Sequence, residues 1–278
     1  MNLNYTDWKN QHRSVLETFP EKKVVMLYTG GKDSSVILSF LLKASEEFGF
    51  EFETSVATYP NHVFPDADKQ ELDRYWRSRG IAIQWHDVNS SDELLEAAVQ
   101  DGKNPCRVCQ KTKRAYLFEY LKRVEQNNKD KHIVVIFSFT LWDLVSYSIE
   151  YLISGVYGHK DSSNTRSDKN TEERFTQTSQ RFYPLIELKD GLTIFKPLLK
   201  YNNQEILKIV SEEQIPLSSV ECTYKDFTPK RKLFEYYDQT NAFFDYDSVL
   251  EYVKHSFKLN EVSFYTDKKK IDFIKNMI

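Results

Sequence analysis

Residues 24 to 35 read Val24-Val25-Met26-Leu27-Tyr28-Thr29-Gly30-Gly31-Lys32-Asp33-Ser34-Ser35. The first five positions form a short apolar run, long enough for a buried strand and too short for a helix. Two glycines follow at once, and after them comes a run of mainly apolar residues that extends toward Glu46. We therefore predict a strand, a tight glycine turn, and a helix that Ser34 or Ser35 caps.

The glycine pair is informative because the whole chain contains only eight glycines. A plain turn from strand to helix needs at most one, so a pair indicates that backbone approaches a ligand closely or adopts a positive φ. In an open parallel sheet, ligands bind beyond the carboxyl ends of the strands, and the first amides of a helix attract anions. We expect residues 29–35 to cradle a phosphate. A glycine turn without any ligand is the alternative.

The rest of the chain continues to alternate strands with helices. Further strands are expected at residues 52–58, 81–86, 132–138 and 192–195, and helices at residues 66–79, 90–100, 109–124, 143–154 and 203–213. This order predicts an α/β fold with a doubly wound, mainly parallel sheet. Residues 155–180 are polar and read as a long loop. We divide the chain into an α/β domain at 1–200 and a C-terminal helical extension at 201–278.

The composition limits the classes of function. The chain has 278 residues with 38 Lys and Arg against 41 Asp and Glu, a net charge of −3 that is too nearly neutral for a sequence-blind grip on nucleic acid. Hydrophobic residues at 40% are ample for a packed core. No apolar run approaches the roughly 18 to 20 residues that span a bilayer, and the first residues lack the features of a signal peptide. We expect a soluble cytoplasmic protein that does not contact membranes.

The chain has three cysteines, two of them in the sequence Cys106-Arg107-Val108-Cys109 and the third far away at Cys222. A secreted protein of this size more often carries an even set of disulfide partners. Free thiols packed in the core are one interpretation. Charged residues around the C-x-x-C pair make that interpretation the less favoured one for Cys106 and Cys109.

The glycine turn does not match the common phosphate loops. Gly31 and Lys32 are followed by Asp33 where the Walker pattern needs Ser or Thr, and the dinucleotide fingerprint is not found. The segment Thr29-Gly30-Gly31-Lys32-Asp33-Ser34 instead resembles the Ser-Gly-Gly-x-Asp-Ser loop of the PP-loop ATP pyrophosphatase superfamily, with Thr29 keeping the hydroxyl of the usual Ser. The resemblance implies that the loop binds the pyrophosphate part of ATP. It also implies that the protein transfers AMP to an oxygen of its substrate.

The residue types of the loop suit that chemistry. Main-chain amides and three hydroxyls would pair with phosphate oxygens, Lys32 would add positive charge, and Asp33 would hold a Mg²⁺ that spreads the charge of the leaving pyrophosphate. ATP and Mg²⁺ are therefore the expected cofactors. The candidate nucleotide-binding residues are Thr29, Gly30, Gly31, Lys32, Asp33, Ser34 and Ser35.

Within this superfamily the cysteine pattern is similar to that of the TtcA and TtuA group of tRNA thiolation enzymes. In that group three cysteines hold a [4Fe-4S] cluster and leave one iron open to bind sulfide. The resemblance implies that Cys106, Cys109 and Cys222 hold such a cluster. Thiolates also suit Zn²⁺, which is the alternative metal.

Two further segments bear on the resemblance. Residues 194–198, Ile-Phe-Lys-Pro-Leu, resemble the basic-Pro-Leu segment of the group. Residues 139–143, Phe-Thr-Leu-Trp-Asp, stand where relatives carry Gly-His-x-x-Asp-Asp, so that only Asp143 remains. Asp143 is a catalytic candidate beside Asp33 and Lys32. It is equally a helix N-terminal acid, favoured there by the helix dipole.

Basic residues gather near the cysteines, against the overall balance of charge. They are Arg107, Lys111, Lys113 and Arg114 after the first pair, and Lys225, Lys230, Arg231 and Lys232 after Cys222. If the cysteines meet in space, the two groups would attract an anionic cluster, a nucleotide or an RNA backbone. Solvated helix faces are the alternative. His62 follows the second strand where a nucleoside would lie, but a surface histidine is the favoured interpretation, and His86 receives no role.

The leading hypothesis is an ATP-dependent sulfurtransferase that adenylates a nucleobase carbonyl, with tRNA as the substrate implied by the resemblance, and replaces the oxygen with sulfur from the cluster. A first alternative keeps the ATP chemistry but acts on DNA, a small molecule or an amide-forming nitrogen, with the cysteines holding zinc or an inert cluster. A second is a nucleotide-binding regulatory or defence protein without turnover. The sequence does not name the sulfur donor, and a homodimer is a candidate assembly.

Overall fold

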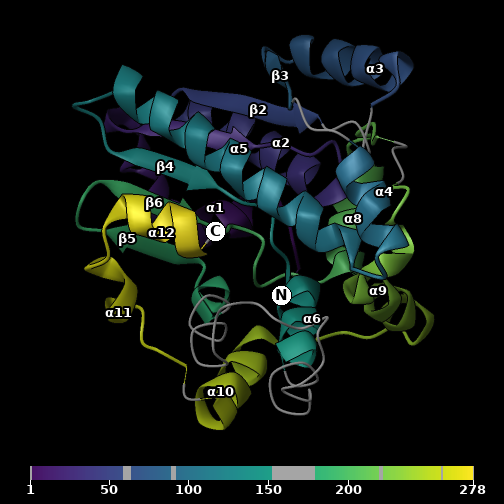
Figure 1. Ribbon diagram of the computed structural model, residues 1–278. Coiled ribbons are helices and arrows are strands. Elements are labelled where there is room, and N and C mark those ends of the chain that lie inside the picture. The colour runs from purple at the N-terminus through teal and green to yellow at the C-terminus, as the bar shows by residue number, and fades with distance from the viewer. Residues whose placement is uncertain are drawn as a thin grey trace.

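The structure is a computed structural model that describes residues 2–58, 64–88, 92–151, 179–218, 222–257 and 259–277 (Figure 1). Its strands are β1 (Lys23–Leu27), β2 (Phe52–Thr58), β3 (Ile83–Asp87), β4 (Ile133–Ile136), β5 (Leu185–Leu188) and β6 (Leu192–Phe195). The helices up to the sheet's last strands are α1 (Tyr5–Leu16), α2 (Lys32–Phe48), α3 (Asp66–Arg77), α4 (Glu93–Gln100), α5 (Pro105–Asn127) and α6 (Leu141–Tyr151). Those that follow are α8 (Asn203–Glu212), α9 (Pro229–Gln239), α10 (Tyr246–Phe257), α11 (Ser263–Thr266) and α12 (Lys270–Met277). Short 3-10 helices are η1 (Phe19–Glu21), η4 (Gln180–Phe182) and η5 (Lys225–Phe227).

The six strands form one sheet in the order β3-β2-β1-β4-β6-β5. Every neighbouring pair is parallel except β5 with β6, which is antiparallel. In register, Val24 of β1 lies between Phe52 of β2 and Val134 of β4. The chain builds outward from β1 to β2 and β3, then returns to the other side of β1 with β4. This confirms the predicted α/β fold with a doubly wound, mainly parallel sheet.

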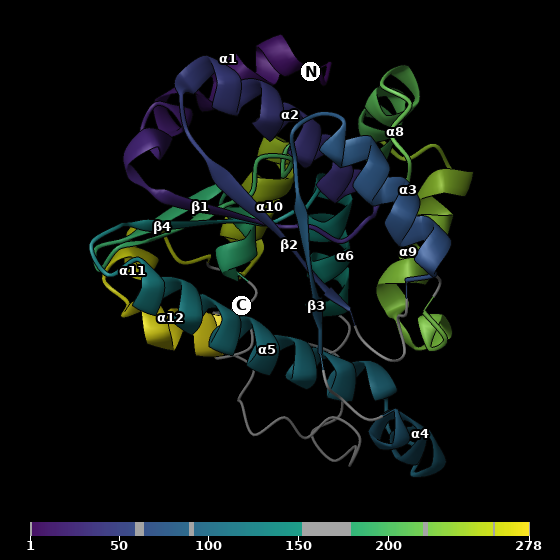
Figure 2. The same ribbon diagram turned by 90° about the horizontal axis from the view of Figure 1, so that it is seen from above.

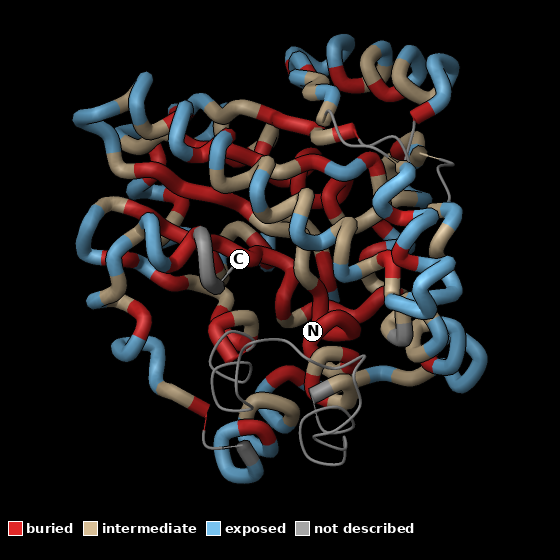
Figure 3. Tube along the Cα trace, in the orientation of Figure 1, coloured by how far each residue is buried: buried red, intermediate tan, exposed pale blue. Residues whose placement is uncertain are grey.

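The sheet is buried on both faces, as parallel sheets require. Because side chains alternate along a strand, Val24 and Met26 enter one core, while Val25 enters the other. Figure 2 shows α1, α2, α3 and α8 on one side of the strands and α5 and α12 on the other. Figure 3 shows buried residues running through the central strands, while the outer helices expose one side. The helices of the described ranges include none long and apolar enough to cross a membrane.

The C-terminal helices pack back onto the α/β core. Helix α8 contacts α2, α9 and α10 contact α6, α11 contacts β5, and α12 contacts α5. The helical character predicted for this part of the chain is thus observed. The division at residue 200 stays a prediction.

Two elements were missed by the sequence analysis, helix α1 and strand β5. Helix α1 begins after Asn4, whose side chain accepts a hydrogen bond from the amide of Asp7. Its buried face is fastened to the segment after β6, because Trp8 Nε1 donates to the carbonyl of Pro197 at 3.2 Å and His12 Nε2 lies 3.1 Å from the same oxygen. Burial lowers the pKa of His12 to about 4, so the ring is neutral and Nε2 donates.

Lys196, in the segment that resembles the basic-Pro-Leu motif, is 1% exposed. Its Nζ donates to the carbonyls of Gln180 and Tyr183, both at 2.8 Å, and its main-chain amide donates to Pro184. Burial lowers the pKa of Lys196 well below its usual value, with the charge of Arg181 acting in the same direction. The structure therefore gives this lysine a role in tying η4 and β5 to β6.

Several helix starts differ from the prediction. Helix α5 begins at Pro105, four residues before the predicted start, with Asn104 accepting a hydrogen bond from the amide of Cys106. Helix α6 begins at Leu141 and not at Asp143. Residues 90 and 91 of the helix predicted at 90–100, most of residues 155–180, and His62 lie outside the described residues.

Candidate active site

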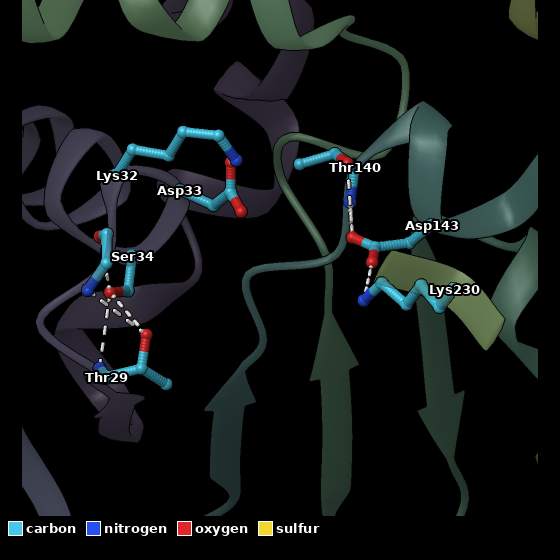
Figure 4. Close-up of polar contacts among 8 residues, drawn as sticks. Thr29, Lys32, Asp33, Ser34, Thr140, Asp143 and Lys230 are labelled. Atoms are coloured by element: carbon cyan, nitrogen blue, oxygen red, sulfur yellow. Dashed lines mark hydrogen bonds and ion pairs between the residues drawn. The ribbon is translucent and has the colours of Figure 1, made fainter. Parts of the chain in front are cut away.

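The candidate site lies where the sheet changes its direction of winding. Strands β1 and β4 are neighbours and parallel, so residues 29–35 after β1 and residues 137–143 after β4 emerge at the same edge. In doubly wound sheets this is the place where ligands bind. Figure 4 shows side chains of both segments at the ends of the strands.

Gly30 is required by its surroundings as well as by its backbone. Its φ is +72°, and a Cβ at this position would lie 2.8 Å from Cε1 of Phe64 and 3.0 Å from Cβ of Ser218. The amide of Ser218 donates to the Gly30 carbonyl at 2.9 Å. A larger residue would therefore be strained and would push away the segment that closes over the turn.

We predicted that Ser34 or Ser35 caps the helix after the glycines, and that prediction was wrong. Helix α2 begins at Lys32 with Gly31 as its N-cap, which leaves the first helical amides without a side-chain cap. The Ser34 hydroxyl donates to the Gly31 carbonyl at 3.0 Å and lies 2.9 Å from the Thr29 hydroxyl (Figure 4). The Ser35 hydroxyl is buried against Tyr28, whose oxygen also accepts from Trp76 Nε1. The hydroxyls thus fix the shape of the turn, and uncapped amides at a helix start are suited to phosphate.

Two carboxylates flank the ends of β1 and β4. Asp33 Oδ1 accepts from Lys32 Nζ at 2.8 Å, and Asp143 forms an ion pair with Lys230 (Figure 4). Burial raises the pKa of Asp33, Lys32 lowers it, Asp143 raises it, and Lys230 lowers it. The two acids therefore act on each other electrostatically. One or two carboxylates together with substrate phosphates are the usual ligands of Mg²⁺, so Asp33 and Asp143 fit the predicted cation.

Asp143 is the helix N-terminal acid that the sequence suggested, and its catalytic role stays a prediction. Its Oδ2 accepts from the amide of Thr140 at 2.8 Å and from the Thr140 hydroxyl at 3.1 Å, which caps helix α6. Its Oδ1 faces Lys230 of helix α9. Burial alone would lower the pKa of Lys230, but the charges of Asp143 and Asp33 raise it, so the lysine stays protonated. The carboxylate is 3% exposed and joins two helices that are distant in sequence.

Cys106 and Cys109 lie in the first turns of α5, and their spacing places them on one face of the helix. The Cys106 Sγ lies 3.2 Å from the Thr228 hydroxyl and 3.8 Å from the Tyr224 carbonyl, so it contacts the segment that follows Cys222. The side chain of Asn104 donates to the Phe227 carbonyl at 3.1 Å and joins the same two segments. All three cysteines are thiols and half-buried.

The three cysteines share one cavity with the glycine turn. Its volume is about 540 Å³, and its walls are Thr29, Gly31, Phe64, Pro105, Cys106, Cys109, Gln110, Lys113, Ser218, Cys222, Tyr224, Lys225, Thr228, Lys230, Arg231 and Phe234. Four of the eight basic residues noted in the sequence therefore line it, while Arg107, Lys111 and Lys232 are exposed. Segments about 190 residues apart in sequence meet here.

The arrangement of the three cysteines can be compared with what zinc and an iron-sulfur cluster require. Three sulfurs around one zinc ion lie about 4 Å apart, as follows from a Zn–S bond of about 2.3 Å. The described part of the chain contains no group of three His, Cys, Asp or Glu side chains gathered closely enough to hold a metal ion. A cluster attaches each cysteine to a different iron, so its ligands stand around a wider space. Cys106, Cys109 and Cys222 line one cavity and are the residues that would hold a metal ion or a cluster there, and its identity stays a prediction.

Comparisons with known proteins agree with this geometry. The chain is 29% identical over 96 residues to the tRNA-cytidine(32) 2-sulfurtransferase of Polynucleobacter asymbioticus, and 27% identical over 104 residues to that of Deinococcus radiodurans. The resemblance to the PP-loop ATP pyrophosphatase superfamily is thereby confirmed. Within that superfamily the chain is similar to the TtcA and TtuA type, as the cysteine pattern predicted. No protein-family model matches the chain.

The extent of these matches is limited. The first covers 34% of this chain and 31% of the relative, and the second 37% and 33%, so the chain spans about a third of the length of these relatives. Among solved structures, the U34-tRNA thiolase NcsA from Methanococcus maripaludis, solved with its [4Fe-4S] cluster, superposes with a TM-score of 0.59. The superposition covers 97% of this chain and 86% of the thiolase at 16% identity, which shows a common fold.

A second cavity of about 240 Å³ adjoins the turn of this PP-loop protein. Its walls are Leu27, Tyr28, Thr29, Ser55, Ala57, Phe64, Lys113, Tyr116, Leu117 and Tyr120, so Thr29, Phe64 and Lys113 belong to both cavities. The Ser55 hydroxyl lies 2.6 Å from the Tyr120 hydroxyl and 3.2 Å from His86 Nε2. Burial raises the pKa of Tyr120 to about 12, so its hydroxyl stays neutral. His86, given no role by the sequence, thus supports the wall of this cavity.

Some residues of the PP-loop site were not recognised in the sequence. The pairing of Lys230 with Asp143 joins positions 87 residues apart, and no local pattern indicates it. Tyr147 and Arg181, which lie next to this pair, carry no motif either. The start of α5 did have a signal, because Asn104 and Pro105 are typical N-cap and N1 residues. That signal would have placed both cysteines on the helix.

Proposed function

We propose that this protein is an ATP-dependent sulfurtransferase that acts on a nucleobase carbonyl in tRNA. The observation that carries the proposal is the cavity wall, where Cys106, Cys109 and Cys222 stand together with Thr29 and Gly31 of the PP-loop. A substrate group in this cavity would be within reach of both an activating nucleotide and a source of sulfur. The similarity to tRNA-cytidine 2-sulfurtransferases supports tRNA as the substrate class.

The PP-loop would hold the phosphates of ATP. The uncapped amides at the start of α2 and the charge of Lys32 would bind the β- and γ-phosphates, and Asp33 and Asp143 would hold Mg²⁺. The second cavity, open to the loop at Thr29 and lined by Tyr116 and Tyr120, would take the adenosine. This arrangement would direct the α-phosphate toward the larger cavity.

Adenylation would then take place at the boundary of the two cavities. The carbonyl oxygen of the base attacks the α-phosphorus and the bond to the β-phosphate oxygen breaks, which releases pyrophosphate. Lys113 and Lys230 line the space where negative charge develops, and both would stabilise it. Sulfur then adds to the activated carbon, and AMP leaves with the original oxygen.

The cysteines would hold the group that delivers the sulfur. A [4Fe-4S] cluster bound by Cys106, Cys109 and Cys222 would supply that sulfur through its open iron. Lys225 and Arg231 line the same cavity and would balance the negative charge of such a group. Phe64, Tyr224 and Phe234 would limit the access of water.

The test is a reaction with anaerobically purified protein, ATP, Mg²⁺, sulfide and unmodified tRNA. We expect about four irons per chain, formation of AMP that requires tRNA, and a thionucleoside in the digested tRNA. The matched control is Cys109→Ala, which should lose the iron and the thionucleoside. One zinc per chain with AMP formation but no thionucleoside would overturn the proposal in favour of an adenylating protein with a different acceptor.

A further inference from the structure

The ring of Tyr147 on helix α6 is contacted by two cations. The guanidinium carbon of Arg181 lies 4.1 Å from the ring centroid, and Nζ of Lys230 lies 5.6 Å from it. Arg181 is also 5.8 Å from the ring of Phe139, which stacks on Phe137. Aromatic contacts of this kind hold a guanidinium in a fixed plane and leave its N–H groups free to bind at the edge.

Arg114 of helix α5 lies close enough to Arg181 for their charges to repel. Burial lowers the pKa of Arg114, and the charge of Arg181 lowers it further. Both arginines are half-buried, and neither has an ion pair or a hydrogen bond in the part of the chain that the structure describes. Two neighbouring cations of this kind attract an anion.

In the part of the chain that the structure describes, two acids lie near this cluster, and both already interact with its cations. Asp143 is already paired with Lys230 and with Thr140. Burial raises the pKa of Glu150, and the charges of Lys230 and Arg181 lower it, so this acid offsets one positive charge among three. Among the described residues around Tyr147, three cations (Arg114, Arg181 and Lys230) therefore face two acids (Asp143 and Glu150).

The position of this cluster relates it to the proposed reaction. Lys230 belongs both to the cavity wall and to the surroundings of Tyr147, so Arg181 lies next to the cavity, with the Asp143–Lys230 pair toward the PP-loop. The phosphates of ATP have their own partners at the start of α2. A phosphate beside the cavity would therefore come from the molecule whose base enters it.

We propose that Arg181, held against Tyr147, and Arg114 bind a backbone phosphate of the RNA whose base is modified. A guanidinium matches a phosphate through two parallel hydrogen bonds. The half-exposed rings of Phe137 and Phe139 offer stacking surfaces to neighbouring bases. The proposal rests on the proposed function, because it takes the acceptor to be RNA.

The experiment compares Arg181→Ala, Arg114→Ala and Arg181→Lys with the unchanged protein, using fluorescence anisotropy with labelled unmodified tRNA over a series of salt concentrations. The control is Lys129→Ala. Lys129 is exposed and precedes β4, so it lies toward the amino ends of the strands, whereas the candidate site lies beyond their carboxyl ends. Each Ala variant should bind tRNA about tenfold more weakly, with a salt slope shallower by about 0.7 to 0.9. Arg181→Lys keeps the charge but loses the paired hydrogen bonds, and should fall between. The control should not differ.

Two further measurements identify the source of the phosphate. Binding of a non-hydrolysable ATP analogue with Mg²⁺, measured by calorimetry, should be the same in all variants. A weaker affinity for the analogue with unchanged affinity for tRNA would overturn the proposal, and so would tRNA binding that none of the variants alters. A DNA duplex that binds as tightly and is equally sensitive to Arg181→Ala would also overturn it.

Failure of the proposed function would look different. In that case the unchanged protein would form no thionucleoside, yet the Arg181 and Arg114 variants would still bind tRNA more weakly than the Lys129 control. Thermal unfolding of each variant separates a local loss of binding from a loss of the fold. Arg181→Lys, which keeps the stem and charge, keeps the test valid if an Ala variant does not fold.

Discussion

The two halves of the cavity are built in different ways. The PP-loop half follows directly from a buried strand and a long helix, and the hydroxyl contacts of Thr29, Ser34 and Ser35 join residues at most seven positions apart. The half that carries Cys222 is held by side-chain contacts across more than 80 residues, such as Lys230 with Asp143 and Cys106 with Thr228. The first half is shaped by secondary structure and the second by a few tertiary contacts. The two should therefore be separable by mutation.

The largest expected effect comes from Cys222→Ser, which alters only the second half. We expect loss of bound iron and of thionucleoside formation, because a cluster with two thiolate ligands is not held. ATP binding should remain, since the PP-loop contacts do not involve Cys222. Iron analysis, nucleoside analysis and calorimetry with an ATP analogue measure the three properties. Cys106→Ser is the matched comparison and should behave alike; retained iron in either variant would contradict the assignment.

The converse change is Asp33→Asn in the first half. Loss of the carboxylate that fits Mg²⁺ should slow AMP formation about 100- to 1000-fold, the range seen when one charge-stabilising group is removed. The iron content should not change. A steady-state assay of AMP and pyrophosphate checks the rate, with Asp73→Asn of helix α3, distant from the loop in sequence, as control. Equal loss of iron and of activity would show that the halves are not independent.

Lowering the pH should reduce the free energy of unfolding through His12. The pKa of His12 is about 4 in the folded chain against 6.5 for an exposed histidine, so the unfolded chain binds more protons between these values. The free energy of unfolding should fall as the pH falls from about 6.5 to 4, by about 3 kcal/mol at most. Urea unfolding at several pH values measures this slope. His12→Gln, which retains a donor to Pro197, should flatten it, and an unchanged slope would assign the effect to other groups.

A smaller effect is expected for the contact between the halves. Lys230→Met leaves Asp143 buried without its cation and should lower the free energy of unfolding by about 2 kcal/mol, a value reduced for the partial exposure of the lysine. Adding Asp143→Asn should recover part of the loss, because the unpaired charge is removed. Denaturant unfolding of the single and double variants gives the coupling energy. Additive losses would mean that the ion pair contributes nothing.

The same contrast explains what the sequence could predict. The PP-loop, the parallel strands and most helices depend on patterns a few residues long, and they were found. Helix α1 was missed because its polar sequence becomes a helix by packing Trp8 and His12 against Pro197. Strand β5 has four residues and forms by pairing with β6. Such contacts depend on the fold as a whole.

The residues of the candidate site also divide into those that local sequence patterns indicate and those that depend on tertiary contacts. The sequence predicted a phosphate loop at residues 29–35 and a site of three cysteines, and the structure brings Thr29, Gly31 and the cysteines to one cavity. It indicated Asp143 as a helix N-terminal acid, but it could not indicate that the second oxygen of this carboxylate would bind Lys230. Nor could it distinguish Lys113 and Lys230, in the cavity wall, from the exposed Lys111 and Lys232. Those distinctions depend on which face of each helix turns inward.

The antiparallel strand β5 has a consequence for how copies of this chain would associate. Strand edges of a sheet readily pair with another molecule, and short or covered edges prevent this. Strand β5 is four residues long, helix α11 packs against it, and the amide of Lys189 just beyond it already donates to Thr266. A second copy would therefore gain little by extending the sheet at this edge.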